Sequence, residues 1–159
     1  LLSNEGKAIT QSTTILEFIS NLKTEHKFLP DAGTFERVEV MSWIAFATSD
    51  LQKAFVPILG ASRMTAVDSA RQEMREYGLT NIHKYLKHIE ESLGGKDFIM
   101  GKHYTFADTA LFTFIGWCKW IEVKTSPYKN VHAYVKRVYQ RPAVQKALAK
   151  EELLDYLPG

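Results

Sequence analysis

Hydrophobic residues recur every three or four positions along most of the chain, a spacing typical of α-helices that bury one face. The first such segment spans 13–22 and is expected to bury the side chains Ile15, Leu16 and Ile19. Residues 7–9, three positions before it, have the composition of a short strand. Segment 24–33 carries proline and glycine, which predict a linker.

Two long helices are expected after this linker. The first begins at about Thr34 and is closed by Pro57 and Gly60. Its apolar stripe is predicted to comprise Val38, Met41, Ala45, Thr48, Leu51 and Phe55. The second helix covers 67–93, with a kink expected at Gly78 and glycine cap residues after its end. Its predicted stripe comprises Val67, Ala70, Met74, Tyr77, Tyr85 and Ile89.

Segment 105–121 is apolar on nearly every side and is therefore expected to be the central helix of the core. It begins with a capping box, in which the Thr105 oxygen accepts from the amide of Asp108 and the Asp108 carboxylate reaches back to the Thr105 amide. A catalytic role for Asp108 is the alternative, although no histidine or serine is fixed beside it in the sequence. Two shorter helices, 128–140 and 143–152, complete an expected all-α bundle of about five helices.

Length, net charge and the length of uncharged runs indicate which kinds of partner the chain can have. The 159 residues, 45% of them hydrophobic, are enough for the core of one domain. A net charge of +2 implies neither nucleic acid nor an acidic membrane surface as a partner. The uncharged run 109–118, which no other run exceeds, is shorter than the about 20 residues that cross a bilayer. We therefore expect no nucleic-acid partner and no membrane partner.

Cysteine and histidine usage adds two further expectations. Cys118 is the single cysteine and cannot form an internal disulfide, which favours a reducing, cytoplasmic location. Because Cys118 lies in the most apolar segment, its pKa is expected to be raised and its role to be packing, with a reactive thiol as the alternative. The five histidines include no pair at i, i+4, so no metal site is expected. The glutamate pairs at 90–91 and 151–152 are expected to be solvated.

The candidate binding chemistry lies where the predicted strand turns into the helix, at Gln11 and Ser12. Ser12 stands where a helix N-cap is expected, and the first-turn amides behind it would point outward with the positive end of the helix dipole. Such an arrangement binds a carboxylate or a phosphate. The alternative is that Ser12 only caps its own helix.

The chain resembles the cytosolic glutathione transferases over nearly its whole length. The resemblance is carried by Ile9-Thr10-Gln11-Ser12, by the long helices, and by Phe98-Ile99-Met100-Gly101-Lys102-His103-Tyr104-Thr105-Phe106-Ala107-Asp108-Thr109. The closing Arg141-Pro142-Ala143-Val144-Gln145-Lys146-Ala147-Leu148 is most similar to the bacterial, or beta, class.

The resemblance implies a domain organisation. Residues 34–159 are expected to be the helical carboxy-terminal domain of the family, and 24–33 the linker before it. Residues 1–23 are expected to be the last strand and helix of a thioredoxin-like, glutathione-binding domain whose remainder lies upstream. The resemblance therefore implies that the chain by itself is inactive.

The resemblance also implies a glutathione site. In the family a Gln/Glu-Ser pair holds the γ-glutamyl carboxylate, which assigns that role to Gln11 and Ser12. The thiol-activating Tyr, Ser or Cys of the family lies near its amino terminus and matches no residue here, so no catalytic residue is assigned. Glutathione is expected as cosubstrate, with no metal.

Segment 43–57 allows a closer comparison of this chain with the bacterial class. Bacterial-class members resemble Trp-x-Asn-Phe-x-x-Ser-Glu-Leu-His-Lys-x-Phe-x-Pro here, with the Asn and His reaching glutathione. In this chain Ala45 replaces the Asn and Gln52 replaces the His, although the Gln52 amide can still donate or accept a hydrogen bond. Lys53 matches and either pairs with a glutathione carboxylate or is solvated.

Two functions follow from the resemblance. The first is a homodimeric transferase that conjugates the glutathione thiol to small apolar electrophiles or exchanges it with them. Its helices from Thr34 and Val67 would form the subunit contact. Phe55, Trp117 and Trp120 are candidates for the electrophile pocket, with core packing as the alternative for each. The second function is a non-catalytic helical module that docks partner proteins.

Overall fold

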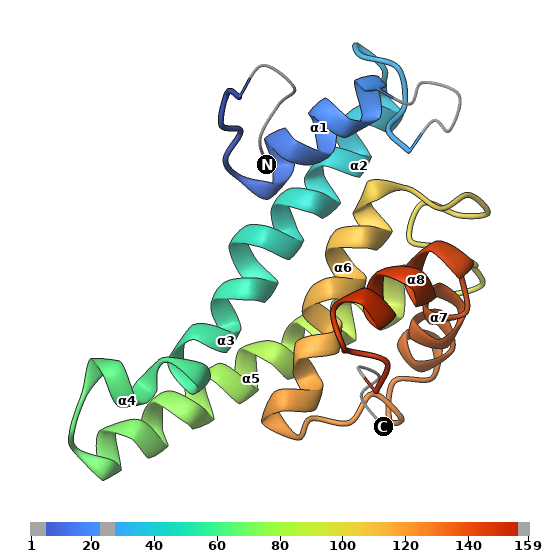
Figure 1. Ribbon diagram of the computed structural model, residues 1–159. Helices are drawn as coiled ribbons and strands as arrows, with labels where there is room; N and C mark the ends of the chain where they lie inside the picture. Colours follow the sequence, from blue (N-terminus) through green and yellow to red (C-terminus); the bar gives the residue numbers. More distant parts are fainter. Residues whose placement is uncertain (1–5, 23–27, 156–159) are drawn as a thin grey trace.

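The computed structural model describes residues 6–22 and 28–155, and these form a helical bundle (Figure 1). Its elements in chain order are α1 (Ser12–Leu22), α2 (Phe35–Ala45), η2 (Phe46–Leu51), α3 (Gln52–Leu59), α4 (Ala61–Met64), α5 (Asp68–Ser92), α6 (Phe106–Gly116), η3 (Trp117–Ile121), α7 (Lys129–Tyr139) and α8 (Pro142–Lys150). The all-α expectation is confirmed. Of residues 7–9, Ala8 alone is assigned to a β-bridge, so the expected strand is reduced to one position in the described ranges.

The first long helix is one continuous rod made of α2, the π-helical η2 and α3. Thr34 caps it by accepting a hydrogen bond from the Arg37 amide at 3.2 Å. Pro57 lies inside the last turn of the rod, which continues to Leu59, and Gly60 occupies the C-cap. The expected start and the role of Gly60 are thus confirmed, whereas the expectation that Pro57 closes the helix is wrong.

The buried stripe of this rod confirms Leu51 and Phe55 of the expected one and differs from it elsewhere. Its buried members are Val40, Ile44, Ala47, Leu51, Ala54 and Phe55. Val38 and Ala45, which were expected inside, are exposed. Both stripes have helical spacing and contain apolar residues, so the pattern alone does not choose between them. Contacts with α5 and α6 bury the stripe that begins at Val40, and they leave Val38 on the surface.

The second long helix, α5, packs against α3. Gly78 lies at this contact, where an added Cβ would come within 2.9 Å of the Ala54 carbonyl oxygen and 2.6 Å of Ile58 Cγ1. α5 is helical without interruption across Gly78, and the glycine permits a close approach of α3 and α5. The kink expected at Gly78 stays a prediction. Val67 and Tyr77, expected in the stripe, are exposed, while Ile82, Leu86 and Ile89 are buried. Gly95 adopts the expected left-handed conformation beyond the helix end, with φ 73°.

Helix α6 lies between α2 and α7, which confirms its central position (Figure 1). The capping box is also confirmed: the Thr105 amide donates to Asp108 Oδ2 at 2.8 Å. Asp108 makes a further bond that the sequence did not indicate, because its Oδ1 accepts from the Ile99 amide at 2.9 Å. The carboxylate therefore joins the preceding loop to the first turn of the central helix.

Glu90 corrects the expectation that the glutamate pair on α5 is solvated. Its Oε1 accepts from the Asn130 amide at 3.0 Å and its Oε2 accepts from the Val131 amide at 2.8 Å. These amides belong to the first turn of α7, whose own N-cap residue, Tyr128, makes no side-chain cap bond. A carboxylate from a neighbouring helix thus satisfies amides that the helix itself leaves unpaired.

Candidate functional site

Gln11 and Ser12 form the amino-terminal edge of α1. The first helical hydrogen bond runs from the Ile15 amide to the Gln11 carbonyl at 3.0 Å, so Gln11 occupies the cap position and Ser12 is the first helical residue. The expectation that Ser12 is the N-cap is therefore wrong by one position. Serine is the better N-cap by preference, but the chain enters the helix through a left-handed Gln11, with φ 66°. Such a conformation is uncommon for a residue with a side chain.

The side chains of Gln11 and Ser12 are both exposed. Helix α1 itself contains no fully buried residue, and Ile19, which was expected inside, is 36% exposed. An ion pair between Glu17 and Arg37, 2.5 Å long, connects α1 to α2. The edge is thus open to solvent and is held beside the bundle by a contact on the neighbouring helix.

Gln52 and Lys53 lie at the start of α3. Gln52 is half-buried and lines a cavity of about 260 Å³ together with Phe55 and Trp117, which we call the α3–η3 cavity. The Phe55 and Trp117 rings meet edge to face at a centroid distance of 5.6 Å. The fold therefore brings Gln52 next to two of the aromatic pocket candidates. Phe55 also belongs to the core, since it is 1% exposed.

The candidates at the start of α1, Gln11 and Ser12, and those on α3, Gln52 and Lys53, belong to separate groups. Within 6–22 and 28–155, no hydrogen bond or ion pair connects Gln11 or Ser12 with Gln52 or Lys53. The Lys53 side chain is exposed. Trp120 is 51% exposed and lies next to Trp117, with ring centroids 5.5 Å apart.

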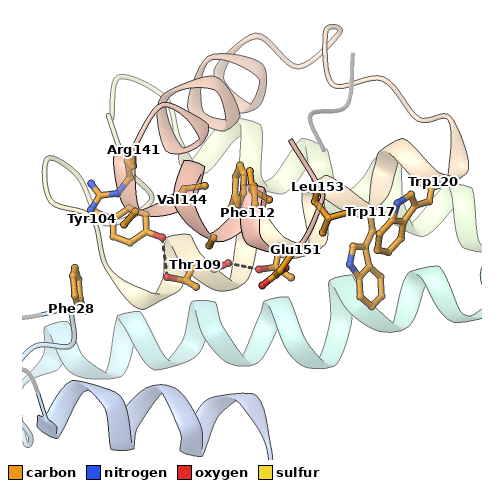
Figure 2. A pocket seen from close by; sticks show the side chains of 14 residues that line it. Phe28, Tyr104, Thr109, Phe112, Trp117, Trp120, Arg141, Val144, Glu151 and Leu153 are labelled. Atoms are coloured by element: carbon orange, nitrogen blue, oxygen red, sulfur yellow. Dashed lines mark hydrogen bonds between the residues drawn. The ribbon is translucent and has the colours of Figure 1, made fainter. Parts of the chain in front are cut away.

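A larger cavity, of about 470 Å³, lies between α6 and α8, and we call it the α6–α8 groove (Figure 2). Trp117 and Trp120 line one end of it, whereas Tyr104 and Arg141 lie at the other. The sequence analysis did not single out Tyr104 or Arg141 as binding residues. Their only sequence signal is that they flank α6 and α8, and their proximity arises from the packing of these helices.

Buried titratable groups occupy the core beside these cavities. Burial raises the pKa of the Cys118 thiol to about 12, so the thiolate is nearly absent at neutral pH and the packing role expected for it is supported. Burial also raises the pKa of Asp108, against the hydrogen bonds from Ile99 and Thr105 that favour its ionised form. In the described part of the chain, no helix is both long and apolar enough to cross a membrane.

Comparison with known proteins identifies the family. A model of the family "Glutathione S-transferase, C-terminal domain" matches residues 46–142. The glutathione S-transferase GstA of Escherichia coli O157:H7 is 24% identical over 153 residues, which are 96% of this chain and 73% of the relative.

Two solved structures extend the likeness to the fold. A beta-class glutathione S-transferase of Sphingomonas chungbukensis is 31% identical, with a TM-score of 0.85 over 96% of this chain and 73% of its own. A sphingomonad glutathione S-transferase solved in complex with glutathione is 26% identical, with a TM-score of 0.84 over the same shares. The helical bundle, the family model and these relatives agree, and the chain belongs to the glutathione S-transferase family.

Proposed function

We propose that the intact protein is a glutathione transferase that conjugates the glutathione thiol to small apolar electrophiles or exchanges it with them. The observation that carries the proposal is the edge of α1, where a left-handed Gln11 presents an exposed Ser12 at the start of the helix. Residues held in sparsely populated backbone conformations concentrate at binding sites, where the surrounding structure compensates for their cost. A glutathione complex of a similar structure supports the choice of ligand.

The edge offers donors to a carboxylate. The first helical bond begins at the Ile15 amide, so the amides of Ser12, Thr13 and Thr14 have no partner within the helix. The Ser12 hydroxyl adds another donor, and the positive end of the helix dipole favours an anion there. The γ-glutamyl carboxylate of glutathione fits this set, with Gln11 beside it.

The α3–η3 cavity is the proposed position of the electrophile. Phe55 and Trp117 supply aromatic walls, and the Gln52 amide supplies one polar group that can donate or accept a hydrogen bond. Ala45 offers no polar side chain, and we assign the contacts of this segment with glutathione to Gln52 and Lys53. The thiol-activating residue is assigned to no position of this chain.

Ser12→Ala in the intact protein is expected to weaken glutathione binding by about tenfold, because the ligand carboxylate loses a charge-assisted hydrogen bond. Titration calorimetry with glutathione measures the effect. Ser69→Ala is the matched control, since Ser69 is also an exposed serine in the first turn of a helix, α5. Equal affinities of wild type and Ser12→Ala would remove Ser12 from the site. If the wild type itself did not bind glutathione, the second function, a non-catalytic helical module that docks partner proteins, would be favoured.

We further propose that the protein is a homodimer in the cytoplasm and that α2 and α5 form its subunit contact. Where α2 and η2 meet α5, the Trp43 ring of α2 stacks on the His88 ring at 5.3 Å, and Phe46 of η2 meets Tyr85 edge to face at 5.4 Å. Val38 on α2 is 56% exposed. An aromatic surface of this kind, with an exposed aliphatic residue on the same rod, is typical of protein contacts.

Val38→Glu is expected to weaken self-association of the intact protein by roughly tenfold or more, because the contact would have to desolvate a carboxylate. Sedimentation velocity over a range of concentrations measures the monomer–dimer equilibrium. Ala149→Glu is the control, since it adds the same charge to an exposed position of α8. An unchanged equilibrium in Val38→Glu would place the subunit contact elsewhere.

A further inference from the structure

The α3–η3 cavity extends from Gln52 along one face of the helical chain into α4. Besides Trp117 of η3, it is lined by Gln52, Phe55, Val56, Leu59, Gly60 and Arg63. These six positions follow one another at the spacing of a single helical face. The rise along such a helix from Gln52 to Arg63 is about 16 Å. The lining therefore runs lengthwise, with Gln52 at one end and Arg63 at the other.

Gly60 keeps Arg63 on this face. The glycine ends α3 and precedes α4, and its backbone is itself helical, with φ −101° and ψ −4°. The Gly60 amide donates to the Val56 carbonyl at 2.9 Å, and the Arg63 amide donates to the Gly60 carbonyl at 2.9 Å. Arg63 thus follows Leu59 by about one turn on the same side of the chain.

The walls between the two ends are apolar. The Trp117 ring meets Phe55 at 5.6 Å and Phe114 at 5.0 Å, edge to face in both cases, so two neighbours hold it in place. Val56 and Leu59 are 45% and 44% exposed and present aliphatic surface to solvent. An apolar molecule that lies along the cavity would remove this surface from water.

Arg63 is an exposed cation without an ion-pair partner. In the part of the chain that the structure describes, no carboxylate lies within ion-pair distance of its guanidinium. Two arginines of the neighbouring α5 differ, since Arg71 pairs with Asp68 at 3.0 Å and Arg75 donates to the Ile121 carbonyl at 3.4 Å. The Arg63 guanidinium therefore has its donors available to a ligand in the cavity.

We propose that the α3–η3 cavity selects elongated apolar electrophiles that carry a carboxylate at the end remote from the reacting carbon, and that Arg63 determines this specificity. The inference rests on the proposed function and adds the class of substrate. Because glutathione is assigned to the Gln52 end, the reacting carbon lies there as well. The apolar body then covers Val56 and Leu59, and the Arg63 guanidinium donates two parallel hydrogen bonds to the carboxylate.

The reaction tested is displacement of chloride from a chloromethyl group. The glutathione sulfur forms a bond to the methylene carbon, the carbon–chlorine bond breaks, chloride leaves with the electron pair, and the thiol proton passes to solvent. The probe is 4′-(chloromethyl)biphenyl-4-carboxylate, and its uncharged carboxamide is the matched control. The shorter pair, 4-(chloromethyl)benzoate and 4-(chloromethyl)benzamide, has the same groups closer together.

The intact protein is expected to conjugate the biphenyl carboxylate with a kcat/KM about tenfold above that of the biphenyl carboxamide, because the guanidinium contact is made by the charged group alone. The shorter pair is expected to show no such preference, since its carboxylate does not reach Arg63 when its methylene group lies at the Gln52 end. Initial rates of thioether formation, corrected for the reaction without protein, measure both. A preference of equal size in the two pairs would show attraction by overall charge and would overturn the proposal.

Arg63→Gln is expected to lower kcat/KM for the biphenyl carboxylate by about tenfold and to leave that for the carboxamide unchanged. Arg71→Gln is the charge-matched control, because Arg71 is a nearby arginine that does not line the cavity. Circular dichroism checks that both variants remain folded. An equal loss in the two variants, or a preference that survives in Arg63→Gln, would overturn the assignment of Arg63.

Failure of this inference is distinct from failure of the proposed function. Equal kcat/KM values of wild type for the biphenyl carboxylate and carboxamide would reject the substrate class and would leave the transferase activity in place. Conjugation of the shorter pair without conjugation of the biphenyl carboxylate would reject it in the same way. If the intact protein conjugated none of the four probes, the proposed function would fail and the inference with it.

Discussion

Asp108→Ala is expected to lower the free energy of unfolding by about 3 kcal/mol or more. The substitution removes the acceptor of the Thr105 and Ile99 amides, which lie at 2.8 and 2.9 Å from the carboxylate. Asp108 itself is fully buried, so water does not replace it as the acceptor. Each buried amide left without a partner costs about 1–3 kcal/mol, and the cap of the central helix is lost in addition.

Urea unfolding followed by circular dichroism measures this loss. Asp68→Ala is the matched control, since Asp68 is also an aspartate in the first turn of a helix, but its carboxylate is exposed and pairs only with Arg71. We expect a change of less than about 1 kcal/mol there. If Asp108→Ala were no less stable than Asp68→Ala, the capping box would not stabilise the fold.

The pH dependence of stability gives a second readout for Asp108. Burial raises the folded-state pKa of its carboxyl above the unfolded value of about 3.9. The native state then holds the proton more tightly than the unfolded state does. The stability that this proton contributes is present below the unfolded pKa and is lost as the pH rises through the folded pKa. The stability of wild type relative to Asp108→Asn is therefore expected to be larger at pH 4 than at pH 7.

Gly78→Ala is expected to destabilise the protein by about 2 kcal/mol, although the same change in an open helix stabilises by roughly 1 kcal/mol. The new Cβ would lie 2.9 Å from the Ala54 carbonyl oxygen, a backbone atom that cannot move without separating α3 from α5. It would also overlap Ile58 Cγ1, at 2.6 Å. Overpacking of this kind shifts backbone and side chains at a cost of about 1–3 kcal/mol.

A double-mutant cycle with Ile58→Ala distinguishes this explanation from a general effect on α5. The shorter side chain removes the overlap at Ile58 but leaves the one with the Ala54 carbonyl oxygen, so part of the Gly78→Ala loss should be recovered. Urea unfolding of the four proteins gives the coupling. Strict additivity, or a stabilising Gly78→Ala, would contradict the close approach.

The sequence predicted best where a local signal and the tertiary structure agree. Thr105 and Asp108 form the expected capping box because both members lie within one helical turn. The apolar stripe of the first long helix was predicted correctly at Leu51 and Phe55 but was misplaced in its first half. Val38 and Val40 both belong to stripes of helical spacing, and only the packing against α5 and α6 distinguishes them. The N-cap was placed at Ser12 from residue preference, whereas the left-handed Gln11 depends on how the chain enters α1.

At the candidate sites too, the sequence identified single residues and the packing decided which of them lie together. The resemblance named Gln52, Phe55 and Trp117 separately, and only the packing of η3 against α3 places them around one cavity. Tyr104 and Arg141 carry no sequence signal as a pair, because they lie 37 positions apart in the chain. Their stacking depends on the angle at which α8 meets α6.

The sequence by itself determined the helical class, the position of the central helix, its capping box and the family resemblance. These depend on local spacing and on hydrogen bonds between residues a few positions apart, which any fold containing the helix preserves. The tertiary structure alone decided which face of each long helix is buried, the close approach at Gly78 and the cavities beside Trp117. Those features depend on how side chains from distant segments fill a common space, and helical periodicity does not encode that arrangement.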